Sequence, residues 1–225
     1  SIYTQFMVVI NVMSCFQYIY LTYTNVDNNR QSDLYLAFFF TAFGIGCLFL
    51  FDWVLSLLCA DNIIHFLGSF HCWVDIMTFI PVFATYNTDC PNFSQMNTPK
   101  EVIFYILCGM TTTRILRSLR FHKYFNAIKD EVQRFLAEMG LKIVVMILFN
   151  AAVIQYLETD QGLPFHTWMY YMLVTIATVG YGDITPVTAL GRFAAMGMII
   201  VAIIIVPQLT NELMEKISRQ SVYAR

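Results

Sequence analysis

The stretch TIATVGYGDITP, residues 175–186, contains two glycines and few bulky side chains, yet some of the most apolar sequence in the chain lies beside it. Apolar runs of about 20 residues are long enough to cross a bilayer as helices. Backbone N–H and C=O groups cannot stay unpaired in hydrocarbon, so irregular backbone at membrane depth must line a protein or water cavity. The stretch therefore predicts a re-entrant loop, and a surface turn is the simpler alternative.

The composition is that of a membrane protein. Hydrophobic residues make up 58% of the 225 residues and charged residues 12%, with a mean hydropathy of +0.60, well outside the usual balance of soluble domains. A net charge of -2 argues against a nucleic-acid partner. All six cysteines except Cys90 lie in apolar runs, so we expect small buried hydrophobes and no disulfide framework.

Six apolar windows approach or exceed the length of a membrane-spanning helix. They are residues 2–26, 34–60, 71–87, 100–114, 132–157 and 189–217. The interval 162–182 is apolar but interrupted by Pro164 and glycines, so it is not a simple span. The expected fold is an all-α membrane protein with six transmembrane helices: a four-helix domain, then helix, re-entrant loop and helix.

The basic residues predict the orientation, because lysine and arginine collect on the cytoplasmic side. Most of them form two clusters: Arg114, Arg117, Arg120, Lys123, Lys129, Arg134 and Lys142, then Lys216, Arg219 and Arg225. Six spans then place both ends of the segment in the cytoplasm, and we expect the plasma membrane. The opposite face holds the glycine loop and the acidic residues Asp27, Asp33, Asp89, Glu158 and Asp160. The polar interval 87–98 is expected to be an extracellular loop.

The glycine loop has the composition of an ion-selectivity filter. Gly180 and Gly182 permit positive φ, so successive residues can take alternating hands and point their carbonyls the same way. A row of carbonyls can replace the hydration shell of an ion. A phosphate cradle would need a lysine and a preceding strand, which are missing here. The motif TxxTVGYGD, which begins at Thr175, resembles the potassium-channel superfamily.

That resemblance implies a tetramer with one filter loop from each subunit and potassium ions in the filter. The implied ion-binding residues are Thr178, Val179, Gly180, Tyr181 and Gly182. Residues 165–177 would form the pore helix, whose dipole favours cations at its C-terminal end. Asp183 and Thr175 would support the filter, and Tyr170 and Tyr171 would pack behind it as an aromatic cuff. No metal other than potassium and no organic cofactor is expected.

A basic helix precedes the pore region. Arg114, Arg117, Arg120 and Lys123 recur every third residue, which winds a positive stripe around a helix, as in a voltage sensor. The alternative is a cluster that is basic only because it lies at the cytoplasmic end. Ionisable residues within apolar spans face a partner or a cavity, so Asp75 and Asp52 are candidate partners. Asp75 is placed for Arg117 or Arg120, although a solvated carboxylate at a helix start would look the same.

A narrower resemblance covers most of the chain beyond the second helix. Five segments look like the Slo, or BK-type, potassium channels: ADN (60–62), WVDIMTFIPVF (73–83), RILRSLRF (114–121), TALGRF (188–193) and VPQL (206–209). This resemblance implies joint opening by voltage and intracellular ions, through cytoplasmic gating-ring domains that are not in these 225 residues. The alternatives are a purely voltage-gated channel, a cyclic-nucleotide-gated channel and a non-conducting channel-like subunit.

The last helix and the connector complete the expected machinery. Apolar residues at 121, 125, 128, 132 and 135 share one helical face, so 121–135 is predicted to be an amphipathic helix that couples sensor to pore. Pro207 should kink or loosen the last helix. By resemblance, Ala202 replaces a hinge glycine, and Gln208 and Asn211 replace acidic residues of large-conductance channels. Large conductance is therefore not expected.

The predicted organisation has four parts. A voltage-sensor-like domain spans 1–120, the connector 121–135, the pore domain 136–218, and the start of a cytoplasmic linker 219–225. An enzyme is not expected, because the four histidines show no metal-binding spacing and no serine or cysteine lies beside a plausible base.

Overall fold

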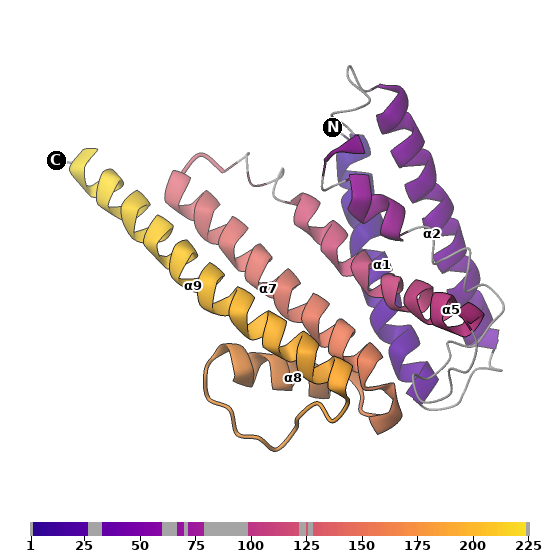
Figure 1. Ribbon diagram of the computed structural model, residues 1–225. Coiled ribbons are helices and arrows are strands. Elements are labelled where there is room, and N and C mark those ends of the chain that lie inside the picture. The colour runs from indigo at the N-terminus through magenta and orange to yellow at the C-terminus, as the bar shows by residue number, and fades with distance from the viewer. Residues whose placement is uncertain are drawn as a thin grey trace. The chain divides into compact units, whose positions relative to one another are not determined.

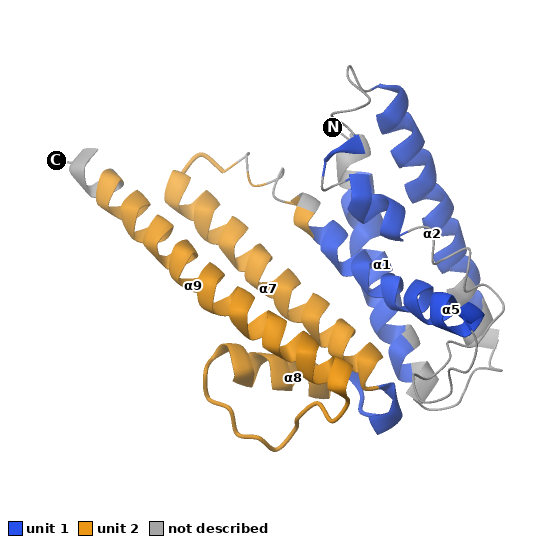
Figure 2. Ribbon diagram, in the orientation of Figure 1, with its two compact units in different colours: residues 1–118, 159–165 blue, residues 119–158, 166–225 orange. Residues whose placement is uncertain are grey.

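The computed structural model describes residues 2–26, 33–59, 67–69, 72–78, 99–121, 125 and 128–223. Within these ranges the regular structure is helical (Figure 1). The described residues divide into two compact units (Figure 2): residues 1–118 with 159–165, and residues 119–158 with 166–225. The first break, at residue 118, lies beside the sensor boundary of 120 that the sequence suggests.

The first unit contains α1 (Ile2–Val26), α2 (Asp33–Leu58), a helical segment at 72–78 and α5 (Pro99–Met110). The helices α1 and α2 pack against each other. Beyond α5 the chain continues as η2, a 3-10 helix over Thr111–Phe121. Runs of 3-10 helix longer than three or four residues are uncommon and often mark strained or functional segments. This one has 11 residues.

Three consecutive threonines mark the point where α5 gives way to η2. The hydroxyls of Thr111, Thr112 and Thr113 donate to the carbonyl oxygens three residues earlier, at distances of 2.7, 2.8 and 2.6 Å. Side chains of this type compete for the backbone acceptors of a helix. Because side chains at i and i+3 eclipse in a 3-10 helix, Arg114 and Arg117 lie on one line along η2. The sequence predicted a winding stripe instead.

The second unit is built on two long helices, α7 (Glu131–Leu157) and α9 (Ala189–Tyr223), which pack side by side (Figure 1). Between them the chain forms η3 (Thr159–Gln161), which belongs to the first unit, and then α8 (Phe165–Ile176). The chain leaves α8 through a loop and returns to the start of α9, at the end of the pair where α7 stops. This path has the predicted order of long helix, short helix, loop and long helix.

Four described helices are long and apolar enough to cross a membrane: Phe40–Leu58, Pro99–Leu119, Glu131–Leu157 and Ala189–Arg219. A shorter apolar helix covers Phe6–Tyr20. The chain is therefore a multi-pass membrane protein. The predicted spans at 2–26, 34–60, 132–157 and 189–217 coincide with helices, whereas most of the predicted span 71–87 and the loop 87–98 lie outside the described residues.

Two expectations are wrong. The connector is not one helix over 121–135, because residues 128–130 are not helical and the following residues begin α7. Asp130 is the N-cap of α7, and its side chain accepts a hydrogen bond from the Val132 amide at 3.0 Å. In addition, Cys108 is disulfide-bonded, although it lies in an apolar run. Cys90 lies outside the described residues.

Candidate functional site

The helix α8, which the sequence predicts to be a pore helix, ends in a hydrogen-bonded C-cap that starts the glycine loop. The amide of Thr178 donates to the Thr175 carbonyl at 3.0 Å, and the amide of Val179 donates to the Val174 carbonyl at 3.0 Å. This pair of bonds is the Schellman motif, which places the residue after the cap in the left-handed region. Thr178 occupies that position with φ of 59°. The loop therefore begins directly after the hydrogen-bonded end of α8.

Positive φ recurs at alternate residues of the loop. Thr178, Gly180 and Gly182 have φ of 59°, 63° and 73°. The positive φ of the two glycines is confirmed, and Thr178 is an addition that the sequence did not predict. A non-glycine residue in this region is strained, and such residues collect at functional sites. The alternation gives the loop the conformation that can turn successive carbonyls to one side. Its residues are exposed, with Tyr181 at 70%.

The predicted supporting residues make contacts within α8 and between α8 and the loop. The Tyr170 hydroxyl hydrogen-bonds the Asp183 carboxylate, and this bond raises the pKa of Tyr170. Tyr171 packs edge-on against Trp168, with ring centroids 6.0 Å apart, and Trp168 is fully buried. The Thr175 hydroxyl donates to the Tyr171 carbonyl at 2.8 Å, so it braces the helix rather than the loop.

Glu158 ties the end of α7 to the start of α9. Its Oε1 accepts hydrogen bonds from the Thr188 amide at 2.9 Å and the Thr188 hydroxyl at 2.7 Å. The same hydroxyl accepts from the Gly191 amide at 2.9 Å, so Thr188 caps α9. The Glu158 side chain is buried, with only 1% exposed. The sequence placed this carboxylate only on the face opposite the cytoplasm and so missed its role in joining α7 to α9.

The middle of α9 contains the predicted gate residues. Ala202 is buried, whereas Pro207, Gln208 and Asn211 are exposed. Pro207 lies inside α9, which continues as a helix to Tyr223. The proline therefore does not end the helix. A hollow of about 450 Å³ lies on this part of the helix and is lined by Ile205, Gln208, Leu209, Asn211, Glu212 and Glu215.

The first unit contains a buried ion pair. The Arg117 Nε donates to the Asp75 Oδ1 at 3.0 Å, and a terminal nitrogen lies 2.9 Å from the same oxygen. The guanidinium carbon lies 3.5 Å from the centroid of the Phe49 ring. All three side chains are at most 3% exposed. The pairing of Asp75 with Arg117 is confirmed over the solvated alternative, and the sequence missed the aromatic partner.

Arg114 lies one 3-10 turn before Arg117 and has a different environment. It is buried at 9% exposed, and its Nε has no hydrogen-bond partner among the described residues. Tyr18 and Cys15 of α1 are close enough to act on it electrostatically. Asp52 is half-buried on α2, three residues after Phe49. Lys123 and the side chain of Arg120 lie outside the described residues.

One face of α1 carries buried polar residues. Asn11, Ser14 and Gln17 are buried polar residues of an otherwise apolar helix. The Gln17 amide donates to the Thr41 hydroxyl on α2 at 2.6 Å, and Cys15 Sγ lies 3.3 Å from the Ser118 hydroxyl on η2. Polar groups in a membrane helix face the protein interior and hydrogen-bond across helices. The polar face of α1 therefore connects it to both α2 and η2.

Part of the chain matches the model of a known protein family. Residues 142–219 match the model of a family described as ion channel. This region runs from the interior of α7 through α8 and the glycine loop into the C-terminal part of α9. The match covers most of the second unit.

The relatives are potassium-channel proteins of several kinds. The human voltage-gated potassium channel regulatory subunit KCNF1 is 25% identical over 178 residues, which is 72% of this chain and 36% of the relative. The calcium-activated potassium channel slo-1 of Caenorhabditis elegans is 23% identical over 196 residues, or 80% of this chain and 16% of the relative. Potassium channel protein 1 of Methanocaldococcus jannaschii is 41% identical over 59 residues, 26% and 17% of the two chains. The chain thus spans about a third of these relatives or less.

Proposed function

We propose that the chain forms the membrane part of a potassium-selective channel. The observation that carries this proposal is the alternating positive φ at Thr178, Gly180 and Gly182, in a re-entrant loop between two membrane-length helices. Carbonyls turned to one side can replace the hydration shell of potassium. Potassium ions are then the cargo, held by residues 178–182, and the bond from Tyr170 to Asp183 supports the outer end of the loop.

A single loop cannot surround an ion, so the proposal includes a homotetramer in which four loops meet. The side chains of α9 favour contacts with other copies and with lipid, because large apolar residues along it are exposed. Phe193, Ile200 and Ile203 are 67%, 60% and 65% exposed in the single chain. The proposal places the basic clusters on the cytoplasmic side of the plasma membrane. Both ends of this segment then lie in the cytoplasm.

We also propose that η2 senses the membrane potential. The support is the 3-10 helix in which Arg114 and Arg117 lie one turn apart, with Arg117 paired to Asp75 over the Phe49 ring. One charge crossing the full field gains about 2.3 kcal/mol per 100 mV, so one charge in each of four copies gains about 9 kcal/mol. Arg117→Gln should flatten the conductance-voltage curve. An unchanged curve would leave η2 as a structural basic segment.

The proposed gating follows the Slo resemblance. Cytoplasmic ion-sensing domains, attached beyond these residues, would act on α9 together with the voltage sensor. Purely voltage-dependent or cyclic-nucleotide-dependent gating is the alternative. Recordings at fixed voltage with calcium, sodium or cyclic nucleotide on the cytoplasmic side separate these cases, because the Slo-type proposal requires a response to an inorganic cation.

A second candidate is a regulatory subunit that does not conduct alone. The observation that favours it is the likeness to KCNF1, which is named a regulatory subunit and matches over 72% of this chain. This candidate predicts no current from the protein alone and an altered current when it is co-expressed with a conducting potassium channel.

The test is potassium flux through the full-length protein. Purified protein is reconstituted into vesicles loaded with potassium, and ion exit is measured with and without a voltage set by an ionophore. Flux of potassium but not sodium supports the channel. Failure to pass potassium at any voltage or cytosolic ion condition contradicts it, and co-expression then tests the regulatory candidate.

A further inference from the structure

A single lysine joins the C-terminal end of α9 to the beginning of α7. The Nζ of Lys216 lies 2.9 Å from the Glu131 Oε1 and 5.2 Å from the centroid of the Phe135 ring. Glu131 and Phe135 are one helical turn apart on α7, so the ammonium lies where it can attract both. Phe135 is buried and the Lys216 side chain is 26% exposed. The Glu131 carboxylate is 67% exposed, so only the lysine end of the contact is partly shielded from solvent.

This contact lies at the opposite end of the helix pair from Glu158. Glu158 joins the last turn of α7 to the first turn of α9, and Lys216 joins the last part of α9 to the first turn of α7. Pro207 lies between the two contacts and cannot donate a backbone hydrogen bond. Any bend of α9 at Pro207 therefore displaces Lys216 relative to Glu131 unless α7 moves with it.

The position of Glu131 also relates the contact to the segment that joins η2 to α7. Residues 128–130 are not helical, and α7 begins directly after its N-cap Asp130. Glu131 is the first residue of that helix. A displacement of the joining segment is thus transmitted to Glu131 before it reaches the rest of α7.

We propose that Lys216 is a latch: its contact with Glu131 and Phe135 stabilises the described conformation of α9, and breaking it shifts the pore to its other state. The inference rests on the proposed channel function and adds a specific gating contact to it. The hollow beside Gln208 and Glu212 lies on the stretch of α9 between Pro207 and the latch.

The functional test compares variants of the full-length protein by conductance-voltage recording. Glu131→Gln and Lys216→Met should shift the midpoint in the same direction, and the double variant should shift it no further. Exposed pairs contribute little each, but four copies act together, so we expect the open-to-closed ratio to change by about tenfold. Exchanging the charges, with Glu131→Lys and Lys216→Glu, should restore the midpoint.

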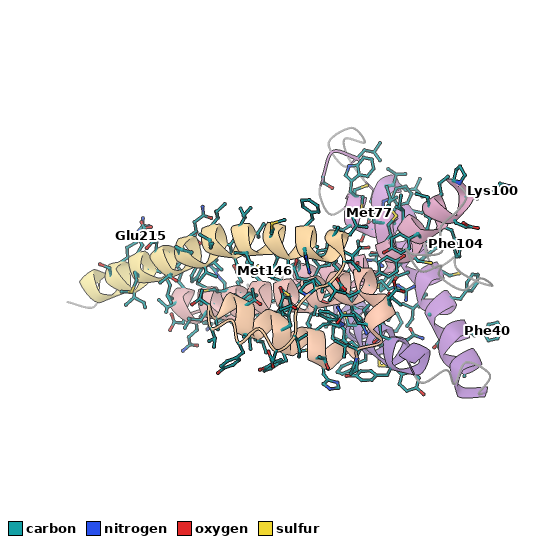
Figure 3. All side chains as sticks on the ribbon, turned by 60° about the horizontal axis from the view of Figure 1, so that its bottom comes forward. Phe40, Met77, Lys100, Phe104, Met146 and Glu215 are labelled. Carbon is teal, nitrogen blue, oxygen red and sulfur yellow. The ribbon has the colours of Figure 1, made fainter. Side chains whose placement is uncertain are left out.

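The matched control is Glu215→Gln. Glu215 is adjacent to Lys216 and pairs with Arg219 on the same helix, and it projects from α9 away from α7 (Figure 3). This variant removes the same charge without touching the latch, so its midpoint should stay near that of the unmodified protein. Additive shifts in the double variant, or an equal shift in Glu215→Gln, would overturn the latch.

A second measurement does not depend on current. The variant with Glu131→Cys and Lys216→Cys should be crosslinked in membranes by a short bifunctional thiol reagent that replaces the length of the two removed side chains, and Glu215→Cys with Glu131→Cys should be crosslinked much less. Absence of the first crosslink overturns the contact whatever the protein conducts. Efficient crosslinking with no potassium flux from the unmodified protein instead contradicts the proposed function, and a crosslink with an unmoved midpoint contradicts the latch alone.

Discussion

The carboxylate of Glu158 occupies the space that a side chain at residue 191 would need. A Cβ built on Gly191 would lie 2.0 Å from the Glu158 Oε1 and 3.0 Å from the Thr188 hydroxyl. Both atoms are fixed by the hydrogen bonds that join α7 to α9. Glycine is therefore required at residue 191 by a contact between two helices rather than by its backbone conformation.

Gly191→Ala should destabilise the second unit by about 1–3 kcal/mol, the usual cost of overpacking. The reason is that Glu158 must leave its bonds to Thr188. Thermal unfolding of the detergent-solubilised protein measures the effect. Gly197→Ala is the control, since nothing lies within 4 Å of a Cβ there and it is on the same helix. Equal melting temperatures for the two variants would mean that the Glu158 contact is dispensable.

Asp75→Asn should destabilise the first unit by about 3–5 kcal/mol, because it leaves the buried Arg117 charge without a carboxylate. The control is Asp160→Asn, which neutralises an exposed carboxylate of η3. Yield and thermal stability of the purified protein report the difference. If both variants melt together, the Arg117 guanidinium has found another anionic partner.

Tyr170→Phe removes one hydroxyl and its hydrogen bond to Asp183. We expect the loop to lose support at its outer end, so that current decays faster during a maintained stimulus while the potassium preference of the initial current is kept. The measurement is the decay time at constant voltage. Asp183→Asn should act in the same direction, and an opposite effect of the two variants would separate Asp183 from Tyr170.

Thr178→Gly should relax the strained backbone at φ of 59°, by up to about 1–2 kcal/mol, because glycine is the preferred residue at this capping position. It also removes the hydroxyl. Thermal stability should therefore rise or hold while potassium affinity falls, and Thr178→Ser should retain affinity without the gain in stability. Affinity unchanged in the glycine variant would remove the hydroxyl from the proposed ion site.

Local patterns made the helices and the glycine loop predictable. Apolar length gave the spans now seen as α1, α2, α7 and α9, and the glycines of VGYG indicated positive φ. The ion pair of Arg117 with Asp75 followed from the rule that charges in apolar spans need partners. These inferences use residues whose chemical requirements do not depend on the rest of the fold.

The missed features depend on contacts between distant residues or on competition between local signals. Glu158 resembles any acid after an apolar helix, and its burial depends on Thr188, 30 residues further along. The left-handed conformation of Thr178 runs against propensity. In the connector, the apolar periodicity predicted one continuous helix through Asp130. Asp130 is instead the N-cap of α7, so that helix begins only after it. The 3-10 geometry of η2 also could not be predicted from α-helical periodicity.

The most direct test of the central claim is the reversal potential of the reconstituted full-length protein between a potassium solution and a sodium solution. We expect a value close to the potassium equilibrium potential, which Gly140→Ala should preserve because nothing lies within 4 Å of a Cβ at this helical position. Gly182→Ala, which places a side chain at φ of 73°, should abolish the current or move the reversal potential towards zero. A reversal potential near zero for the unmodified protein, or potassium selectivity untouched in Gly182→Ala, would contradict the assignment of the loop as a potassium filter.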